Sequence, residues 1–394
     1  MNQNLIERER KLCFNYFYDN FDKSPLTYGL THDMYPTKHN DSSVAATGFM
    51  LSAMAVGCDF GYITRGEGEE ICFKTLKTHA KLERKNGFYY HFYNISDGQR
   101  ARKCELSIID TALFIAGALT AGAYFGGKTL ELARRIYLEC DWEYFYSKEK
   151  KYFYMAEFEN GFSGYWDVYA EQLILYFLAA GSPKGEKIAA EAYSSFKRLK
   201  GSWGGHEFIY SWFGSIFTHQ FSHAFLDFKD KKDAFGVDWF ENTVQATEAN
   251  FAFCRDHSKE YKGYENGWGL TACLTKQGYK GHIGTAPSGN GNTENVSNGT
   301  IPPCGALGSM PYTPELSIAA LEYFYSKPRL IGKYGLVDAY NDDEDWYSES
   351  YIGIDKGITL LMLANYEKQT VWRNFNSLPE MQKAFETLQF KKEN

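Results

Sequence analysis

The sequence lacks three features that would assign it at once to a large class of proteins. Residues 1–11 contain no apolar signal region, and we expect no run to approach the length of a transmembrane helix. The eight cysteines include no Cys-x-x-Cys pair and are scattered, which is typical of small core residues in a reducing compartment. The net charge of −7 leaves no basic surplus to neutralise phosphates, which argues against a nucleic acid or an anionic membrane as partner. The simplest expectation is a cytoplasmic protein.

The composition is that of a globular protein with a substantial core. The 394 residues are 44% hydrophobic and 23% charged, enough for one large domain or two ordinary ones. We find no linker that divides the chain, so we expect a single domain over residues 1–394. Aromatic residues make up 17% of the chain, with 30 Tyr, 30 Phe and 8 Trp. Tyr and Trp in such numbers suit stacking against the apolar faces of sugar rings.

The hydrophobic periodicity predicts about twelve helices and no convincing sheet. Segment 106–125 is apolar all round and the following segment 129–146 is amphipathic, and the pair 167–180 and 184–199 repeats this contrast. A buried helix followed by an amphipathic one predicts an inner and an outer ring of helices, as in an α/α barrel. The other expected helices cover 4–20, 43–58, 66–84, 215–228, 236–257, 314–326, 354–366 and 377–390.

One long stretch, 258–313, is expected to be irregular. Its central part, 284–308, is dense in Gly, Asn, Ser, Thr and Pro, and aromatic residues flank it. Long irregular loops in compact domains are usually functional or disordered, so we expect this one to cover a substrate. Short extended pieces near 87–93 and 151–158 are expected to form hairpins at the mouth of the barrel.

The residue that points most directly to chemistry is Glu171. It precedes an apolar run among Trp166, Tyr165 and Tyr169, and we expect it in the first turns of a helix over 167–180. Burial of a carboxylate raises its pKa, and a carboxylic acid that stays protonated near neutral pH is the general acid of a glycosidase. The alternative is that Glu171 caps or hydrogen-bonds a neighbouring helix end.

Other polar residues interrupt apolar segments. Glu105 and Asp110 flank the start of an apolar helix, where they either cap the helix or bind a ligand. His219 and His223 are four residues apart on an expected helix, which is a possible metal-ligand spacing. No Glu follows the first His and no third ligand is near, so we expect no metal and favour sugar binding or a structural role for them.

Acidic residues also stand beside aromatic ones in two loops. Glu265 lies near Trp268, and Asp345 precedes Trp346, a combination found in sugar-binding sites. Asp355 is expected at a helix N-terminus, where the positive end of the helix dipole keeps a carboxylate ionised. It is either an N-cap or the low-pKa partner of Glu171.

The motifs together resemble the glycoamylase-like family, which includes the bacterial β-1,2-glucanases of glycoside hydrolase family 144. They occur in order along the chain, at 46–49, 61–65, 87–92, 105–113, 169–172, 181–183, 217–220, 265–272, 299–303, 309–315, 335–340 and 354–357.

The resemblance implies an all-α (α/α)6 barrel, with small hairpins and long loops at the active-site end. It implies an inverting hydrolase of β-1,2-glucan or its oligosaccharides, without a metal or other cofactor. Glu171 matches the proposed general acid and Asp355 is the best match for its partner, with Asp338 and Asp345 in the same region. The residues expected to bind substrate are Glu105, Asp110, His91, Tyr169, His219, Gln220, Glu265, Trp268, Asp345 and Trp346.

Two other functions remain open from the sequence. A sugar epimerase on a similar barrel would use His219 or His223 as its base. A non-catalytic glycan-binding protein would need only the aromatic residues. A hydrolase, by contrast, needs two carboxylates.

Overall fold

Two apolar helices, α2 (Val44–Asp59) and α4 (Ile108–Phe125), pack against each other in the computed structural model, which describes residues 2–36 and 39–392. Ser43 and Ser107 cap them: each serine hydroxyl accepts a hydrogen bond from a backbone N–H in the first turn. The helices meet at Gly48 and Gly117, where a Cβ atom on Gly117 would lie 1.9 Å from the Gly48 carbonyl oxygen. Glycine is required at this contact because any side chain would separate the two backbones.

Helix α4 is long and apolar enough to cross a membrane by length and composition alone, and 78% of it is buried inside the protein. The expectation that no run reaches this length is therefore wrong for α4. Its burial is that of a core helix. The amphipathic helix that follows, α5 (Gly127–Glu139), buries Thr129, Leu132, Ala133 and Ile136, which share one face at helical spacing. The predicted contrast between a buried and an amphipathic helix is confirmed for this pair.

Each expected helix is present except one. The region 215–228 instead forms two short 3-10 helices, η2 (Ile216–His219) and η3 (Ser222–Ala224). The side chains of Gln220 and Ser222 bond to segments distant in sequence, and these tertiary contacts outweigh the local helical pattern. The remaining helices are α1 (Asn2–Asp19), α3 (Arg65–His79), α6 (Leu173–Gly181), α7 (Glu186–Ser195), α8 (Trp239–Asp256), α9 (Gly289–Asn292), α10 (Pro303–Leu307), α11 (Pro314–Tyr325), α12 (Gly353–Lys368), α13 (Thr370–Phe375), α14 (Pro379–Thr387), η1 (Trp142–Phe145), η4 (Lys262–Glu265) and η5 (Pro328–Leu330).

The strands are short and form small antiparallel sheets. Hairpins form at both expected places: β3 (Arg84–Lys85) pairs with β4 (Phe88–Tyr89), and β8 (Tyr152–Phe158) pairs with β9 (Gly161–Tyr165). Their position at the mouth of a barrel stays a prediction. The other strands are β1 (Met34–Tyr35), β2 (Asp41–Ser43), β5 (Phe92–Asn94), β6 (Leu106–Ser107), β7 (Tyr146–Ser147), β10 (Lys200–Trp203), β11 (His206–Ile209), β12 (Lys231–Lys232), β13 (Cys273–Thr275), β14 (Gly278–Lys280), β15 (Thr300–Ile301), β16 (Ile331–Gly332), β17 (Gly335–Leu336), β18 (Tyr340–Asn341), β19 (Trp346–Tyr347), β20 (Tyr351–Ile352) and β21 (Lys391–Lys392).

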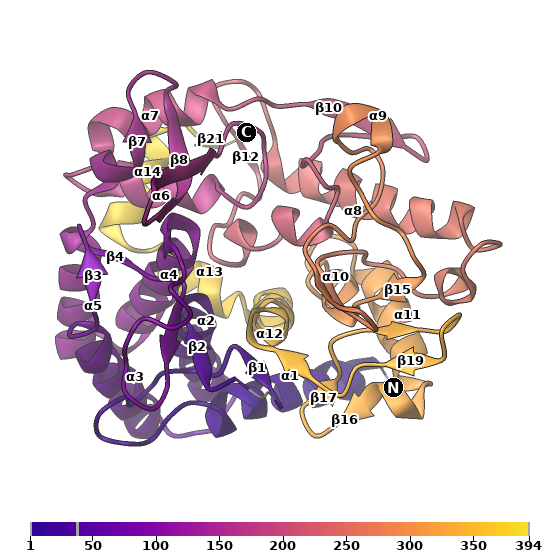
Figure 1. Cartoon of the computed structure of the whole chain (residues 1–394), viewed down its shortest axis with the longest axis horizontal. Helices are drawn as coiled ribbons and strands as arrows, with labels where there is room; N and C mark the ends of the chain where they lie inside the picture. Colours follow the sequence, from indigo (N-terminus) through magenta and orange to yellow (C-terminus); the bar gives the residue numbers. More distant parts are fainter. Residues whose placement is uncertain (1, 37–38, 393–394) are drawn as a thin grey trace.

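The stretch 258–313 is not one irregular loop, because η4, β13, β14, α9, β15 and α10 all fall within it. Its hairpin β13–β14 carries Leu274 and Tyr279, which line a cavity of the protein. The same cavity is lined by residues at or near the N-terminal ends of α2, α4, α6 and α12. Figure 1 shows α12 end-on near the middle of the view, with α2 beside it and α4 beside α2. The N-terminal ends of α2, α4, α6 and α12 therefore surround this cavity, and the β13–β14 hairpin extends into its wall.

Candidate active site

Glu171 lies in a tight turn immediately before α6, rather than inside a helix that begins at 167 as the sequence predicted. The buried side chain of Gln172 closes this turn: its Oε1 accepts from the N–H of Ala170 at 2.5 Å and its Nε2 donates to the carbonyl of Val168 at 2.8 Å. Ser222 fixes the other side, because its hydroxyl donates to the carbonyl of Glu171 and accepts from the N–H of Ile174. These hydrogen bonds hold the Glu171 backbone in one position.

The Glu171 side chain lies at the junction of two cavities, and it lines both of them together with Phe217. Burial raises the pKa of Glu171 to about 7, and the negative charge of Asp110 acts in the same direction. A carboxyl group with this pKa is largely protonated in weak acid and can donate its proton near neutral pH. The predicted high-pKa carboxyl group is confirmed.

The first cavity, here called the acid cavity, has a volume of about 470 Å³. Its wall combines four carboxyl groups with two histidines, His39 and His91, an arginine and several apolar side chains. The residues that line it include Asp33, Asp41, His91, Arg102, Asp110, Glu171, Phe92, Ile109, Phe217, Phe221, Leu274 and Tyr279.

His91 joins two of the predicted acidic residues. Its Nδ1 lies 2.8 Å from Oε1 of Glu105, and its Nε2 lies 3.6 Å from Oδ1 of Asp110. Burial opposes the charged imidazole, but the two carboxylates outweigh it and raise the pKa of His91 to about 9. The hydrogen bond from His91 in turn lowers the pKa of Glu105. The hydroxyl of Ser107, the N-cap residue of α4, donates to Asp110 at 2.5 Å, so the cap of the helix also holds a carboxyl group of the cavity wall.

Three residues of the acid cavity were missed at the sequence level. The backbone N–H of Asp33 donates to the carbonyl of Asp41, and burial raises the pKa of Asp33. Arg102 forms an ion pair with Asp41 and lies over the ring of Phe92. The segments 31–34 and 100–104 have no helical or strand periodicity, and only their isolated charges next to apolar residues could have marked them.

The second cavity, here called the aromatic cavity, has a volume of about 650 Å³. Trp212 and Phe213 are exposed large hydrophobic residues on its wall, at 37% and 43% of their full surface. Apolar rings exposed beside a carboxyl group with a raised pKa suit sugar rings, which stack on aromatic faces. Tyr165, Trp166, Tyr169, Val168, Ser211, Phe217 and Met155 line the same cavity.

Neither cavity is lined by Gln220, Trp268 or His219, three of the other predicted binding residues. Gln220 is fully buried and donates to the Gly305 carbonyl and the Ser309 hydroxyl, and Trp268 is 1% exposed in the core. His219 is 2% exposed, and burial lowers its pKa to about 3, so it stays neutral. Tyr169 does line the aromatic cavity, and its buried ring stacks on Trp239.

Two predicted acids and a tryptophan also lie elsewhere. Asp345 is exposed and pairs with Arg329, and Glu265 is exposed at the end of η4. Trp346 follows Asp345 in the chain and lies on β19. The sequence correctly associated acids with aromatic residues here, but none of these three residues lines a cavity with Glu171.

Asp355 is in the first turn of α12, as predicted, and is 6% exposed. The expectation that its carboxylate has a low pKa is wrong. Burial, together with the neighbouring carboxyl group of Asp338, raises the pKa of Asp355 well above its usual range. Asp355 lines a separate small cavity with Asp338, and Ile352 belongs to both this cavity and the acid cavity.

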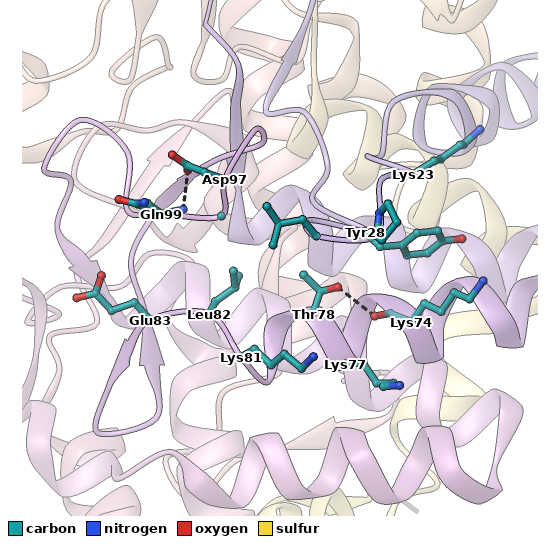
Figure 2. A pocket seen from close by; sticks show the side chains of 13 residues that line it. Lys23, Tyr28, Lys74, Lys77, Thr78, Lys81, Leu82, Glu83, Asp97 and Gln99 are labelled. Carbon is teal, nitrogen blue, oxygen red and sulfur yellow. Dashed lines mark hydrogen bonds between the residues drawn. The ribbon is translucent and has the colours of Figure 1, made fainter.

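A third hollow, of about 650 Å³, lies between α3 and the loops at 23–28 and 97–99. Figure 2 shows that Lys74, Lys77 and Lys81 follow one side of it, with Lys23 and Tyr28 opposite. None of the predicted site residues that the structure describes lines this hollow, so its chemistry is not that of Glu171.

Comparisons of the sequence with known proteins identify a family and a relative. The Glycoamylase family matches residues 163–379, which is more than half of the chain. An exo-β-1,2-glucooligosaccharide sophorohydrolase from Parabacteroides distasonis is 26% identical over 98% of this chain, and the chain spans 58% of that protein's length.

Solved structures match over the whole chain. An endo-β-1,2-glucanase from Chitinophaga pinensis, in complex with sophorotriose and glucose, is 28% identical with a TM-score of 0.88, covering 100% of this chain and 99% of that one. A glucoamylase candidate from Bacteroides uniformis is 27% identical with a TM-score of 0.90, covering 100% and 98%. The chain belongs to the glycoamylase family.

Proposed function

We propose that this protein is a glycoside hydrolase that cleaves β-1,2-linked glucan or its oligosaccharides. The observation that carries the proposal is the position of Glu171, between a polar and an aromatic cavity, with a pKa of about 7. A sugar chain that passes from one cavity into the other brings a glycosidic oxygen to this carboxyl group. Glu171 then donates its proton to that oxygen as the general acid.

The substrate class is supported by the relatives. The Parabacteroides distasonis protein is named for the release of sophorose units from β-1,2-glucooligosaccharides, and the Chitinophaga pinensis enzyme is named as acting within β-1,2-glucan. The acid cavity offers carboxylates that accept hydrogen bonds from sugar hydroxyls, with His91 and Arg102 as donors.

The proposed architecture is a single (α/α)6 barrel over residues 1–394. The gathering of the N-terminal ends of α2, α4, α6 and α12 at the acid cavity supports it, because the inner helices of such a barrel run in one direction. Their positive dipole ends also favour the carboxylates and the polar hydroxyls of a ligand there.

The base remains a choice between two carboxyl groups. The family resemblance assigns Asp355, and we retain it as the proposed base, acting on a water by inversion and without a metal. Asp110 competes, because it lines the acid cavity and its charge raises the pKa of Glu171. Loss of the base removes the acidic limb of the pH profile of kcat/KM, so Asp355→Asn and Asp110→Asn distinguish the two.

The test is incubation with linear β-1,2-, β-1,3- and β-1,4-glucans, followed by sizing of the products. We expect turnover of the β-1,2-linked chain alone. Release of disaccharide from the start indicates exo action, and a ladder of sizes indicates endo action. Binding of β-1,2-glucan without turnover would support the non-catalytic alternative, and no binding of any of the three would overturn the proposal.

A further inference from the structure

One wall of the acid cavity is a β-hairpin that carries an aromatic ring. Leu274 and Tyr279 are cross-strand partners in β13 and β14, so their side chains lie on the same face of the hairpin, and both line the acid cavity. Tyr279 is 53% exposed, so its ring is open to a ligand. An exposed phenol ring on a polar cavity wall suits a sugar ring, which stacks on it through an apolar face.

The hairpin is held in place by hydrogen bonds to two other segments. The backbone N–H of Leu274 donates to Oδ2 of Asp338 at 2.7 Å. Two residues before the hairpin, the hydroxyl of Thr271 accepts from the backbone N–H of Phe217 at 3.1 Å. Phe217 lines both the acid cavity and the aromatic cavity, so the hairpin is tied to the place where the two meet. Because this wall is already ordered, less conformational entropy is lost when a sugar binds to it.

The chain continues from this hairpin out of one cavity and into the other. Tyr279 lines the acid cavity, and Gly281, two residues later, lines the aromatic cavity. Two residues of extended chain span at most about 7 Å, so the cavities adjoin along this segment. They also adjoin at Glu171 and Phe217, which line both. We therefore expect a sugar chain that passes Glu171 to pass the segment 279–281 as well.

Gly281 leaves space where the two cavities adjoin. A Cβ atom added to Gly281 would meet only a ring carbon of Tyr279, at 3.9 Å, which is an ordinary van der Waals distance. The φ angle of Gly281 lies outside the left-handed region, in contrast to that of Gly278 at the start of β14, which is +106°. Neither the backbone nor the neighbouring atoms require glycine at 281. The effect of this glycine is to keep a side chain out of the aromatic cavity.

We propose that Tyr279 stacks on the glucose unit held in the acid cavity, and that Gly281 leaves open the passage by which the glucan chain continues into the aromatic cavity. This inference rests on the proposed function and deepens it, because it names two residues that determine how the substrate is bound. Lys280, which lies between them, pairs with Cys273, so its side chain lies on the opposite face of the hairpin. The contact with the sugar chain is therefore made by a ring and by bare backbone rather than by a charge.

The role of Tyr279 is tested by steady-state kinetics on β-1,2-glucan oligosaccharides. Stacking that is equal in the ground state and the transition state lowers KM without changing kcat. We expect Tyr279→Ala to raise KM about tenfold with little change in kcat, and Tyr279→Phe to keep the wild-type KM because it retains the ring. Tyr366→Ala is the control, because Tyr366 is 39% exposed and lines neither cavity. A wild-type KM in Tyr279→Ala, or a Tyr279→Phe variant as impaired as Tyr279→Ala, would overturn the stacking.

The passage is tested by side chains of increasing size at Gly281, each variant being checked for folding by circular dichroism. We expect Gly281→Ala to keep most of the wild-type kcat/KM, and Gly281→Val and Gly281→Leu to lower it increasingly, by about tenfold or more for leucine. Gly66→Leu is the control, because a Cβ atom there would meet nothing within 4 Å and Gly66, in α3, lines neither cavity. Wild-type activity in Gly281→Leu would overturn the passage. Equal losses in Gly281→Ala and Gly281→Leu would also overturn it, because they would mean that the backbone requires glycine.

These outcomes separate this inference from the proposed function. Cleavage of the glucan that is unaffected by the Tyr279 and Gly281 variants would overturn the inference while the hydrolase proposal stands. If the wild type binds the oligosaccharide without cleaving it, the hydrolase proposal fails, and calorimetry on the same variants decides the inference. A loss of affinity of about tenfold in Tyr279→Ala, and none in Tyr366→Ala, would then support it. An oligosaccharide that is neither bound nor cleaved would overturn both.

Discussion

The Nδ1 atom of His91 lies 2.8 Å from the Oε1 atom of Glu105, and its Nε2 atom lies 3.6 Å from the Oδ1 atom of Asp110. Because the carboxylates raise the pKa of His91 to about 9, the histidine is an imidazolium at neutral pH. It therefore donates from both ring nitrogens and cannot act as a base there. The arrangement ties the loop that carries His91 to the start of α4.

This arrangement predicts a pH-dependent contribution to stability. The folded-state pKa of about 9 exceeds the ordinary 6.5 of histidine, so the contribution is complete below pH 6.5 and is lost as pH rises to about 9. We expect His91→Gln to lower the free energy of unfolding by about 1–3 kcal/mol below pH 6.5 and by much less above pH 9. Urea denaturation across this range measures it, with His257→Gln as the control. A cost independent of pH would contradict the imidazolium.

The same three residues offer ligand atoms that lie within 4.8 Å of one another, an arrangement that could hold a metal ion. The protonated His91 is hydrogen-bonded to Glu105 and ion-paired with Asp110, and an imidazolium cannot ligate a metal. We therefore expect hydrolysis to be unchanged after treatment with a chelator and dialysis. Activity that is abolished by the chelator and restored by zinc would contradict both the ion-pair description and the proposed mechanism.

The sequence predicted most helices because their periodicity is local. The helix predicted at 215–228 is absent. There the side chain of Gln220 donates to Gly305 and Ser309, and that of Ser222 donates to Glu171. Such contacts join segments that are distant in sequence, and no local pattern records them.

The candidate site shows the same division. Glu171 was predicted because an acid among aromatic residues is visible in the sequence itself. The high pKa of Asp355 was not, because it depends on Asp338, a partner whose proximity only the fold creates. The ion pair of Arg102 with Asp41 was missed for the same reason.

Glu171→Gln is expected to fold normally and to lose turnover by about 10²–10⁴-fold, because the amide cannot donate a proton to the leaving oxygen. Binding of oligosaccharide should persist, since the variant keeps the size of the side chain. Turnover and binding are measured by product release and calorimetry. The control is Glu159→Gln, which changes an exposed glutamate in the β8–β9 turn. If Glu171→Gln unfolds or turns over normally, Glu171 is structural.

The pKa of Glu171 also predicts the alkaline side of the pH profile. A general acid has to be protonated, so kcat/KM should fall as pH rises through about 7, by tenfold for each further pH unit. The residual activity of Glu171→Gln should lack this limb. Wild-type rates that stay constant well above pH 7 would assign the acid role to another group.

The stereochemical outcome follows from the separation of the two carboxyl groups. A retaining glycosidase holds them about 5–5.5 Å apart, whereas an inverting one needs about 6.5–9.5 Å to admit a water. Glu171 lines the acid cavity, and Asp355 lines a separate, smaller cavity that shares only Ile352 with it, so we propose the wider separation. We therefore expect a β-linked substrate to yield the α-anomer first. NMR of the freshly released reducing end measures this directly. Initial release of the β-anomer would mean a double displacement, in which the second carboxyl group attacks the sugar itself and no water needs to fit between them.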